Sequence, residues 1–196
     1  RRVGGGAYGE VFKADWNMSD VAVKRLTVHR CEGDELETQT TQFQNEVQLL
    51  ARARHPNVVQ LSGVVVDDPS FLCLLMELVP RGRSLRKLLD AAPEKVTGSE
   101  SMQLKLAHGI AAGMAYLHGR TPPMLHHDLK SENVLIGENI DGFVPKIADF
   151  GLATGTGGST VRTTREKGAG TLEYKAPELF RGKPFTTACD VYAFGI

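Results

Sequence analysis

The chain has 196 residues, of which 41% are hydrophobic and 23% are charged. This length allows one or two domains with a substantial core, and the composition is that of an ordinary globular protein. Lys plus Arg equal Asp plus Glu at 23 each, so no overall attraction to nucleic acid or to anionic lipid is expected. The longest apolar run, residues 71–76, is far too short to cross a bilayer, and no membrane segment is expected in this chain.

The three cysteines, Cys31, Cys73 and Cys189, are widely spaced and odd in number. They form neither a disulfide framework nor a zinc pattern, and the simplest interpretation is reduced thiols in a cytoplasmic protein, or on the cytoplasmic side of a larger receptor. The first residue is Arg rather than Met and no signal-peptide pattern opens the chain, so we expect a fragment of a longer product.

The first part of the chain has the pattern of β-strands. Residues 10–14 and 21–24 are short, rich in β-branched side chains and separated by turn-forming residues. The apolar runs 58–66 and 71–79 are predicted to be a second pair of strands, joined by Asp67-Asp68-Pro69.

Two helices are also predicted. The first has three apolar residues at helical spacing, Phe43, Val47 and Leu50. It is expected to end at residues 55–57, because the residue before a proline avoids the α region. From residue 84 the hydrophobic period is helical, and Thr97 with Glu100 three residues later fits a capping box. The stripe that follows is expected to be core packing and consists of Met102, Leu106, Ile110, Met114 and Leu117.

This order of elements predicts an α+β fold with two lobes, a strand-rich lobe with one helix and a mainly helical lobe. We expect the first lobe to span residues 1–79 and the second to span 80–196, with the change near Pro80-Arg81-Gly82. The stretch from Thr154 to Thr164 is rich in Gly, Ser and Thr, and it is predicted to be a mobile loop.

A glycine-rich segment near the start of the chain could bind phosphates. Gly4, Gly6 and Gly9 follow the spacing G-x-G-x-x-G, which lets backbone N–H groups approach an anion without a Cβ in the way. Alone this signal is weak, and dinucleotide-binding proteins use a similar loop that leads into a helix. Here a strand-like segment follows, and the next strand ends in Lys24, which could supply a charge for the phosphates. Glu46 is the best candidate for the carboxylate partner of Lys24. The plain alternative is that Lys24 and Glu46 form only a surface ion pair.

The most specific run is His126-His127-Asp128-Leu129-Lys130-Ser131-Glu132-Asn133, followed by Asp149-Phe150-Gly151. An Asp, an Asn five residues later and a second Asp can place one proton acceptor beside two metal ligands. Transfer of a phosphoryl group from Mg-ATP to a hydroxyl requires that arrangement. Asp128 is the candidate base, whereas Asn133 and Asp149 offer the hard oxygen atoms that Mg²⁺ prefers. Lys130 could neutralise charge on the transferred group.

A plainer interpretation exists for each part of this run. A lone Asp-Phe-Gly is more often a turn than a metal site. Metal ligation by His126 and His127 is disfavoured, because adjacent residues on an extended loop point apart and no third ligand is evident.

Together, the glycine loop, Val21-Ala22-Val23-Lys24, Glu46, the run 126–133, Asp-Phe-Gly and Ala176-Pro177-Glu178, in this order, resemble the eukaryotic protein kinases. Residues 55–59, 128–133 and 190–195 resemble the tyrosine-kinase-like group. Lys130 and Thr171 resemble the pattern of members that act on Ser and Thr. The resemblance implies an ATP- and Mg²⁺-dependent kinase that phosphorylates Ser or Thr of protein substrates. A catalytically silent kinase-fold scaffold is the alternative.

The resemblance also implies an adenine pocket. Met76 would guard its back, while Glu77 and Val79 would offer backbone groups to the adenine edge. The apolar walls and the cover of this pocket would come from Val3, Val11, Ala22 and Leu135 together with the glycine loop. Simple core packing is the plain alternative for these apolar residues, and they could do both.

Relative to a whole kinase domain, the resemblance lacks most of the first strand and the helices that would follow Ile196. Val191, Tyr192, Phe194 and Ile196 would then be partly uncovered, and the 196-residue chain alone is expected to be of marginal stability.

His127 departs from the family pattern, in which an Arg pairs with a phosphate on the activation segment. A neutral imidazole offers one donor and no lasting charge. We therefore expect activity to depend weakly on phosphorylation of the candidate segment, whose hydroxyl residues are Ser159, Thr160, Thr163 and Thr164, with Thr171 further along.

Replacement of Ser159, Thr160, Thr163 and Thr164 together by Ala should leave most of the kinase activity, because His127 provides no permanent charge for a phosphate there. The measurement is the rate of phosphate transfer to a generic Ser/Thr peptide, with the unsubstituted protein as reference. A loss beyond about tenfold, or about 1.4 kcal/mol of barrier, would contradict this expectation.

Overall fold

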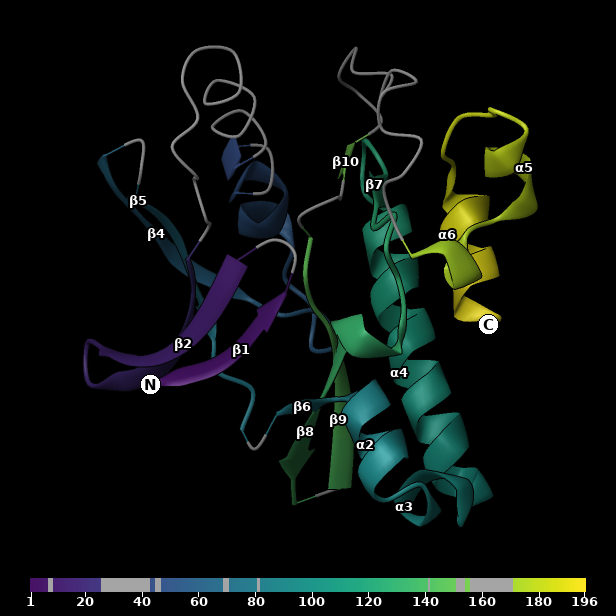
Figure 1. Ribbon diagram of the computed structural model, residues 1–196, viewed down its shortest axis with the longest axis horizontal. Helices are drawn as coiled ribbons and strands as arrows, with labels where there is room; N and C mark the ends of the chain where they lie inside the picture. The colour runs from purple at the N-terminus through teal and green to yellow at the C-terminus, as the bar shows by residue number, and fades with distance from the viewer. Residues whose placement is uncertain are drawn as a thin grey trace.

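A computed structural model describes residues 1–6, 9–25, 43–44, 47–68, 71–80, 82–140, 142–150, 154–155 and 171–196. These residues form two lobes that lie side by side, one rich in strands and one mainly helical (Figure 1). The predicted α+β, two-lobed fold is therefore confirmed, whereas its division at residue 80 stays a prediction. Predictions for Glu46, Gly151, Ser159, Thr160, Thr163 and Thr164 lie outside the described residues.

The first lobe is an antiparallel sheet. Its strands are β1 (Arg2–Gly6), β2 (Gly9–Trp16), β3 (Ser19–Arg25), β4 (Leu61–Asp68) and β5 (Phe71–Glu77), in the order β1-β2-β3-β5-β4. All the predicted strands are present, but β4 begins three residues later than expected. Residues 58–60 cross toward the second lobe instead, where Val58 forms a bridge with Ile147.

The helix predicted around Val47 is present in residues 43–44 and 47–52, and Phe43 and Leu50 are buried in the main core. In the second lobe the helices are α2 (Leu85–Ala91), α3 (Glu94–Thr97), α4 (Glu100–His118), α5 (Pro177–Phe180) and α6 (Thr187–Phe194). Two single 3₁₀ turns, η1 (Ser131–Asn133) and η3 (Leu172–Tyr174), lie beside the loop that carries Asp128.

The second lobe also contains strands that the sequence pattern did not predict. The strands β6 (Arg83–Ser84), β8 (Val134–Asn139) and β9 (Gly142–Ile147) form a sheet, and β7 (Met124–Leu125) pairs with β10 (Thr154–Gly155). Because β8 and β9 join η1 to Asp149, this hairpin carries the candidate metal ligands.

The predicted start of α4 is wrong. Thr97 ends the preceding helix α3, and its hydroxyl donates to the carbonyl of Pro93 at 3.0 Å. The N-cap of α4 is Ser99, which has extended backbone and accepts a hydrogen bond from Met102 N at 3.3 Å. The core stripe of α4 is confirmed, since Leu106, Ile110, Met114 and Leu117 are buried and Met102 packs against them.

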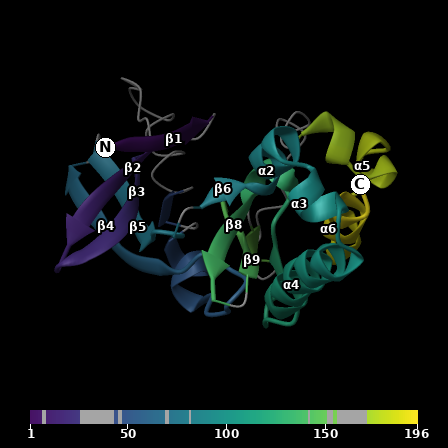
Figure 2. The same ribbon diagram turned by 90° about the horizontal axis from the view of Figure 1, so that it is seen from below.

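Helix α4 packs closely against β9 and the crossing segment 57–59, and α6 lies on another side of it (Figure 2). Asn57 Nδ2 donates to the carbonyl of Pro145 at 2.8 Å, and the backbone of residues 57 and 59 bonds to Ile147 in both directions at 2.8 Å. Gly109 and Gly113 permit this approach, because a Cβ at either position would lie under 3.0 Å from a β9 side chain.

Apolar side chains on and after α6 are exposed, as the sequence indicated. Val191 is 61% exposed, Tyr192 40%, Phe194 41% and Ile196 64%.

Gly113→Ala should destabilise the fold by about 2 kcal/mol, although Ala is the better helix former by about 1 kcal/mol. The new Cβ would lie 2.7 Å from Ile147 Cδ1 and 2.9 Å from the Asn57 carbonyl oxygen. Urea unfolding midpoints provide the measurement. Gly63→Ala is the control, because no atom lies within 4 Å of a Cβ there. A Gly113→Ala protein as stable as the parent would refute this close packing.

Candidate active site

The strand register places the predicted pocket residues of the first lobe on one face of the sheet. Val11 on β2 lies opposite Lys24 on β3, and Met76 on β5 lies opposite Ala22. Side chains two residues apart on a strand point to the same face, so these four share a face. Leu135 is half-buried on β8 of the other lobe. The register thus gathers the expected adenine walls of the first lobe.

The predicted glycine loop is the connection between β1 and β2. Gly4 pairs with Val11, and Gly6 pairs with Gly9. Val3 on β1 is 47% exposed. The described glycines therefore lie at the end of a hairpin rather than before a helix, which removes the dinucleotide-loop alternative.

Lys24 and Asp149 are brought together from the two lobes. Lys24 Nζ lies 2.9 Å from Asp149 Oδ1, and Lys24 is buried while the Asp149 side chain is one-third exposed. Asp149 follows β9 and has a φ of +64°, an uncommon left-handed conformation for a residue other than glycine. Lys24, which was predicted to bind phosphates, therefore contacts Asp149, which was predicted to bind a metal ion.

Asp128 accepts hydrogen bonds from four donor groups. Its Oδ1 accepts from Thr171 N at 3.0 Å and from Thr171 Oγ1 at 3.1 Å. Its Oδ2 lies 3.0 Å from Asn133 Nδ2 and 2.8 Å from Lys130 Nζ. Lys130 Nζ also donates to Thr171 Oγ1 at 2.5 Å, which joins the three side chains in one network. The side chain of Asp128 is only 4% exposed.

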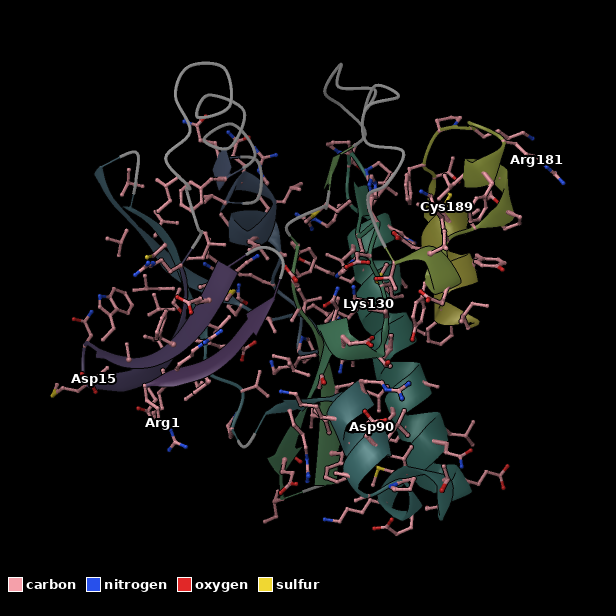
Figure 3. The ribbon with its side chains drawn as sticks, viewed as in Figure 1. Arg1, Asp15, Asp90, Lys130, Arg181 and Cys189 are labelled. Atoms are coloured by element: carbon pink, nitrogen blue, oxygen red, sulfur yellow. The ribbon has the colours of Figure 1, made fainter. Side chains whose placement is uncertain are left out.

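The sequence-predicted residues Asp128, Lys130 and Asn133 are thus in direct contact, and Thr171 joins them although it was expected only as part of the activation segment. Lys130 lies at the centre of the molecule, between the β1–β2 hairpin and the helices α5 and α6 (Figure 3).

Asn133 is oriented as a metal ligand would be. Its Nδ2 donates to both the backbone oxygen of Asp128, at 2.8 Å, and the carboxylate, so its amide oxygen points away from these bonds. Within the described residues no cluster of three or more His, Cys, Asp or Glu side chains could hold a metal ion. A cation held by Asn133 and Asp149 would therefore need further oxygen atoms, as Mg²⁺ obtains from water and phosphates.

His126 links the loop of Asp128 to the strand that carries Asp149. Its Nε2 lies 3.1 Å from the carbonyl oxygen of Ala148, and its Nδ1 accepts from Asp128 N at 3.3 Å. A neutral ring with its proton on Nε2 satisfies both contacts. The ring centroid lies 5.1 Å from that of Phe150, so His126 packs against this residue.

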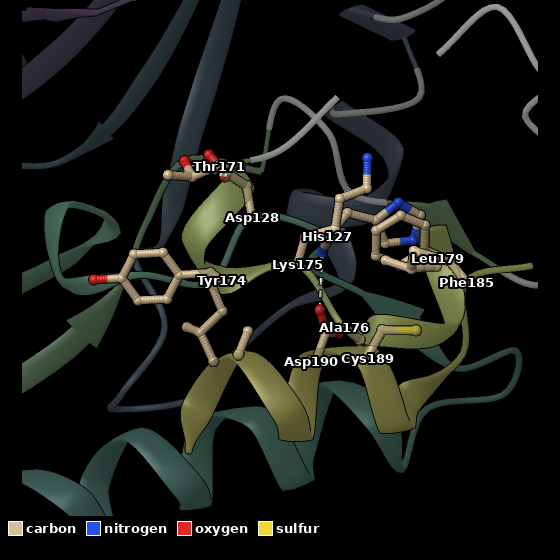
Figure 4. Close-up of a pocket in the computed structure, with 12 residues that line it drawn as sticks. His127, Asp128, Thr171, Tyr174, Lys175, Ala176, Leu179, Phe185, Cys189 and Asp190 are labelled. Atoms are coloured by element: carbon tan, nitrogen blue, oxygen red, sulfur yellow. Dashed lines mark hydrogen bonds between the residues drawn. The ribbon is translucent and has the colours of Figure 1, made fainter. Parts of the chain in front are cut away.

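The ring of His127 contacts a different aromatic residue from the ring of His126. Its ring stacks on Phe185 with centroids 4.0 Å apart and an interplanar angle of 7°, and its φ is +68°. The two rings lie together at one end of a small pocket, and the amide of His127 is joined to Asp190 (Figure 4). Because the two imidazoles diverge, they do not form a joint metal site. His127 is a buried stacking residue, a role that its sequence position did not reveal.

Asp190 is a buried residue behind this site, and the sequence pattern did not reveal its role. It is 2% exposed. Its Oδ2 accepts from His126 N and Oδ1 from His127 N, both at 2.9 Å. His118, in the last turn of α4, places Nε2 2.9 Å from Oδ2. Burial alone raises the pKa of a carboxyl, but the hydrogen bonds from His118 and from the two amides hold the pKa of Asp190 below its ordinary value.

After β5 the chain passes from the first lobe to the second, and this connection, called the hinge here, carries a further contact. The side chain of Glu77 accepts from Gln60 N at 2.9 Å and lies 2.8 Å from Lys146 Nζ on β9. Val79 is buried against Gly137 of β8, where a Cβ would come within 2.9 Å of Val79 Cγ1. Both residues predicted to face adenine thus also tie the hinge to the second lobe.

An antiparallel-sheet lobe, a mainly helical lobe, and Lys24, Asp128 and Asn133 gathered between them define the architecture of a protein kinase domain. The family described as protein tyrosine and serine/threonine kinase matches residues 1–196, and the chain belongs to this family.

Named relatives agree with this assignment. The chain is 38% identical over 195 residues to the probable serine/threonine-protein kinase SIS8 and 38% identical to the serine/threonine-protein kinase CTR1, both of Arabidopsis thaliana. It is 39% identical to the probable serine/threonine-protein kinase drkB of Dictyostelium discoideum. These matches cover 100% of this chain but 18%, 22% and 26% of the relatives.

The family predicted from the motifs is confirmed. None of the helices in the described part of the chain is long and apolar enough to span a membrane.

Asp190→Asn should destabilise the fold by about 3 kcal/mol at pH 7, because it removes one partner of a buried charged contact. The folded-state pKa of Asp190 lies below the ordinary 3.8, so the native state releases its proton more readily than the unfolded state. This stabilisation is full above the unfolded pKa and is lost as the pH falls through the folded pKa. Urea unfolding at pH 7, 5 and 3.5 measures the difference, which should shrink only at the lowest pH. An equal difference at all three values would contradict it.

Proposed function

We propose that the protein carrying this domain transfers the γ-phosphoryl group of ATP to Ser and Thr hydroxyls of protein substrates. The observation that supports this most directly is the set of contacts around Asp128. A buried carboxylate is aligned by Lys130, Asn133 and Thr171, beside the Lys24–Asp149 pair. The relatives named above are serine/threonine-protein kinases by name, which supports the same hydroxyl class.

The residues present fit Mg²⁺ and ATP. Asn133 and Asp149 would hold the ion through oxygen atoms, and Lys24 would neutralise the phosphates. The glycine hairpin and the shared face of Val11, Ala22 and Met76 would hold the nucleotide, with Glu77, Val79 and Leu135 completing the adenine site. The bound ion would supply charge neutralisation on the phosphate oxygens.

Asp128 would then orient the substrate hydroxyl and accept its proton, and Lys130 would stabilise negative charge on the transferred group. Thr171 fixes the carboxylate through its backbone N–H and its hydroxyl, from the segment that precedes Ala176-Pro177-Glu178. Its position resembles the pattern of family members that act on Ser and Thr. The physiological substrate is outside this proposal. The cytoplasmic location expected from the cysteines stays a prediction, as does the Lys24–Glu46 pairing.

A catalytically silent scaffold is the competing function. It would keep the nucleotide site and lose transfer. Lys24, Asp128, Lys130, Asn133 and Asp149, which the transfer would use, are all among the described side chains, and the observed Asp128 network favours the enzyme.

Asp128→Ala should lower phosphate transfer by at least about 10³-fold while nucleotide binding stays intact, since the carboxylate acts on the hydroxyl rather than on ATP. The measurements are transfer to a generic Ser/Thr peptide and binding of a fluorescent ATP analogue, by the protein at its natural length.

Asp90→Ala is the matched control. Asp90 is half-exposed on α2 and pairs only with Arg86 among its described contacts, so transfer should be unchanged. Activity that survives Asp128→Ala would overturn the assignment of the base. Nucleotide binding without any transfer by the unsubstituted protein would favour the scaffold.

A further inference from the structure

An aromatic stack joins the loop that carries Asp128 to the connection between α5 and α6. The imidazole of His127 lies on the ring of Phe185, with centroids 4.0 Å apart and an interplanar angle of 7°. His127 is buried, and Phe185 is the half-buried residue of a connection, 181–186, whose other residues are exposed. The contact of this connection with the catalytic loop is therefore concentrated at one ring.

The stack lies next to the transfer site along the chain. His127 immediately precedes Asp128, and its φ of +68° is a conformation that persists outside glycine only where surrounding contacts fix it. Thr171 lies on the same segment as Phe185, separated from it by η3 and α5. The segment 171–185 thus begins at a residue that hydrogen-bonds to Asp128 and ends at a residue stacked on the neighbour of Asp128.

A small pocket separates these two contacts, and its walls come from both the loop and the segment 171–185. Figure 4 shows the rings of His127 and Phe185 on one side of this pocket and Thr171 with Asp128 on the other. Because the pocket interrupts the packing between the segment and the loop, their separation depends on the contacts at its borders.

The carboxylate of Asp128 is sensitive to the position of this segment. Two of the donor groups that it accepts, a backbone amide at 3.0 Å and a hydroxyl at 3.1 Å, belong to Thr171. A shift of the segment away from the loop lengthens both hydrogen bonds at once. Small displacements of a group that must align with a substrate hydroxyl have large effects on rate.

We propose that Phe185 is a positioning residue of the transfer site, whose ring, stacked on His127, holds the segment 171–185 where Thr171 aligns Asp128. The proposal rests on the proposed kinase function. Two flat rings in face contact fix a separation and need no charge on either partner, whereas an aliphatic side chain has no flat face to match the imidazole. Without the stack, the hydrogen bonds from Thr171 to Asp128 open more often.

Two substitutions at residue 185 separate the ring from apolar bulk. Phe185→Leu removes the flat face and keeps an apolar side chain, whereas Phe185→Tyr keeps the ring. In the protein at its natural length, kcat for a generic Ser/Thr peptide should fall about tenfold in the Leu variant and stay within about threefold in the Tyr variant. KM for ATP should change by less than about twofold in both, because the nucleotide contacts come from other elements.

Phe180→Leu is the matched control. Phe180 is 61% exposed on α5, so the same substitution removes a ring from a neighbouring position without touching the stack, and kcat should stay within about twofold. A folded Phe185→Leu variant with full kcat would overturn the proposal. So would a variant whose loss appears equally in KM for ATP, since a general disturbance of the domain would do the same.

The stack is also tested from its other side. His127→Phe keeps a flat ring without ring nitrogen atoms, whereas His127→Leu has no ring, and both side chains meet the same left-handed backbone. We expect kcat within about threefold of the unsubstituted protein for the Phe variant and a loss of about tenfold for the Leu variant. Equal losses in the two would show that the imidazole acts through its nitrogen atoms rather than its face, and would overturn the proposal.

A double substitution tests whether the two rings act as one unit. In a His127→Leu background, Phe185→Leu should lower kcat by less than about twofold further, because the stack has already been removed. A full further tenfold loss would show that Phe185 acts by another route, and the proposal would fail.

Amide hydrogen exchange of Thr171 provides a readout that does not depend on activity, because this amide donates to Asp128 Oδ1. Exchange should be faster in the Phe185→Leu variant and unchanged in the Phe185→Tyr variant; equal exchange in both contradicts the proposal. If Phe185→Leu does not fold, His127→Phe and His127→Leu provide the same comparison. An unsubstituted protein without transfer activity would overturn the proposed function alone, and the exchange comparison would still decide the role of Phe185.

Discussion

The carboxylate of Asp190 is the contact on which the geometry of the catalytic loop depends. Ionised and almost fully buried, it would be strongly unfavourable in the core if donors did not surround it. Those donors come from two elements, the last turn of α4 and the loop of residues 126–127. The carboxylate therefore fixes α4, α6 and the loop together. The same requirement that its charge be satisfied forces two successive amides to point at one side chain, which is why His127 adopts a positive φ.

A second constraint acts at β9, where the lobes meet. The backbone of residues 57–59 bonds to Ile147, and the glycines of α4 let that helix approach the same strand closely. Two residues after Ile147 the chain reaches Asp149, which pairs with Lys24 of the first lobe. The position of the candidate metal ligand thus follows from close packing at the seam between the lobes. A substitution in α4, far from any phosphate, can affect the site through this strand.

The sequence predicted best what local spacing determines. Asp128, Lys130 and Asn133 lie within six residues, so their contact follows from the path of one loop. The contact between Lys24 and Asp149 spans 125 residues and was not predicted, since the sequence pointed to Glu46 as the partner of Lys24 and to Asp149 only as a metal ligand. The role of Asp190 was missed because nothing local distinguishes a buried anchor from an ordinary helix carboxylate.

Other differences have equally specific causes. Thr97 and Ser99 both suit a helix N-cap, and only the separate short helix α3 decides between them. The strands β8 and β9 are short and contain Gly and Pro, which weaken the period-2 signal. The expectation that His127 carries no lasting charge stays a prediction. The compensating stack on Phe185, 58 residues later in the chain, depends on tertiary structure.

The contacts of Asp128 also limit how it can act. A carboxylate offers about four lone-pair positions, and here four donors occupy them. A substrate hydroxyl that bonds to Asp128 must therefore displace a donor. The hydroxyl of Thr171 is the least costly donor to displace. The backbone amide of Thr171 still donates to Oδ1 of Asp128, and Lys130 can still donate to the hydroxyl oxygen of Thr171. Since phosphoryl transfer passes through a loose transition state that requires little early proton removal, alignment of the hydroxyl is the larger part of what Asp128 contributes.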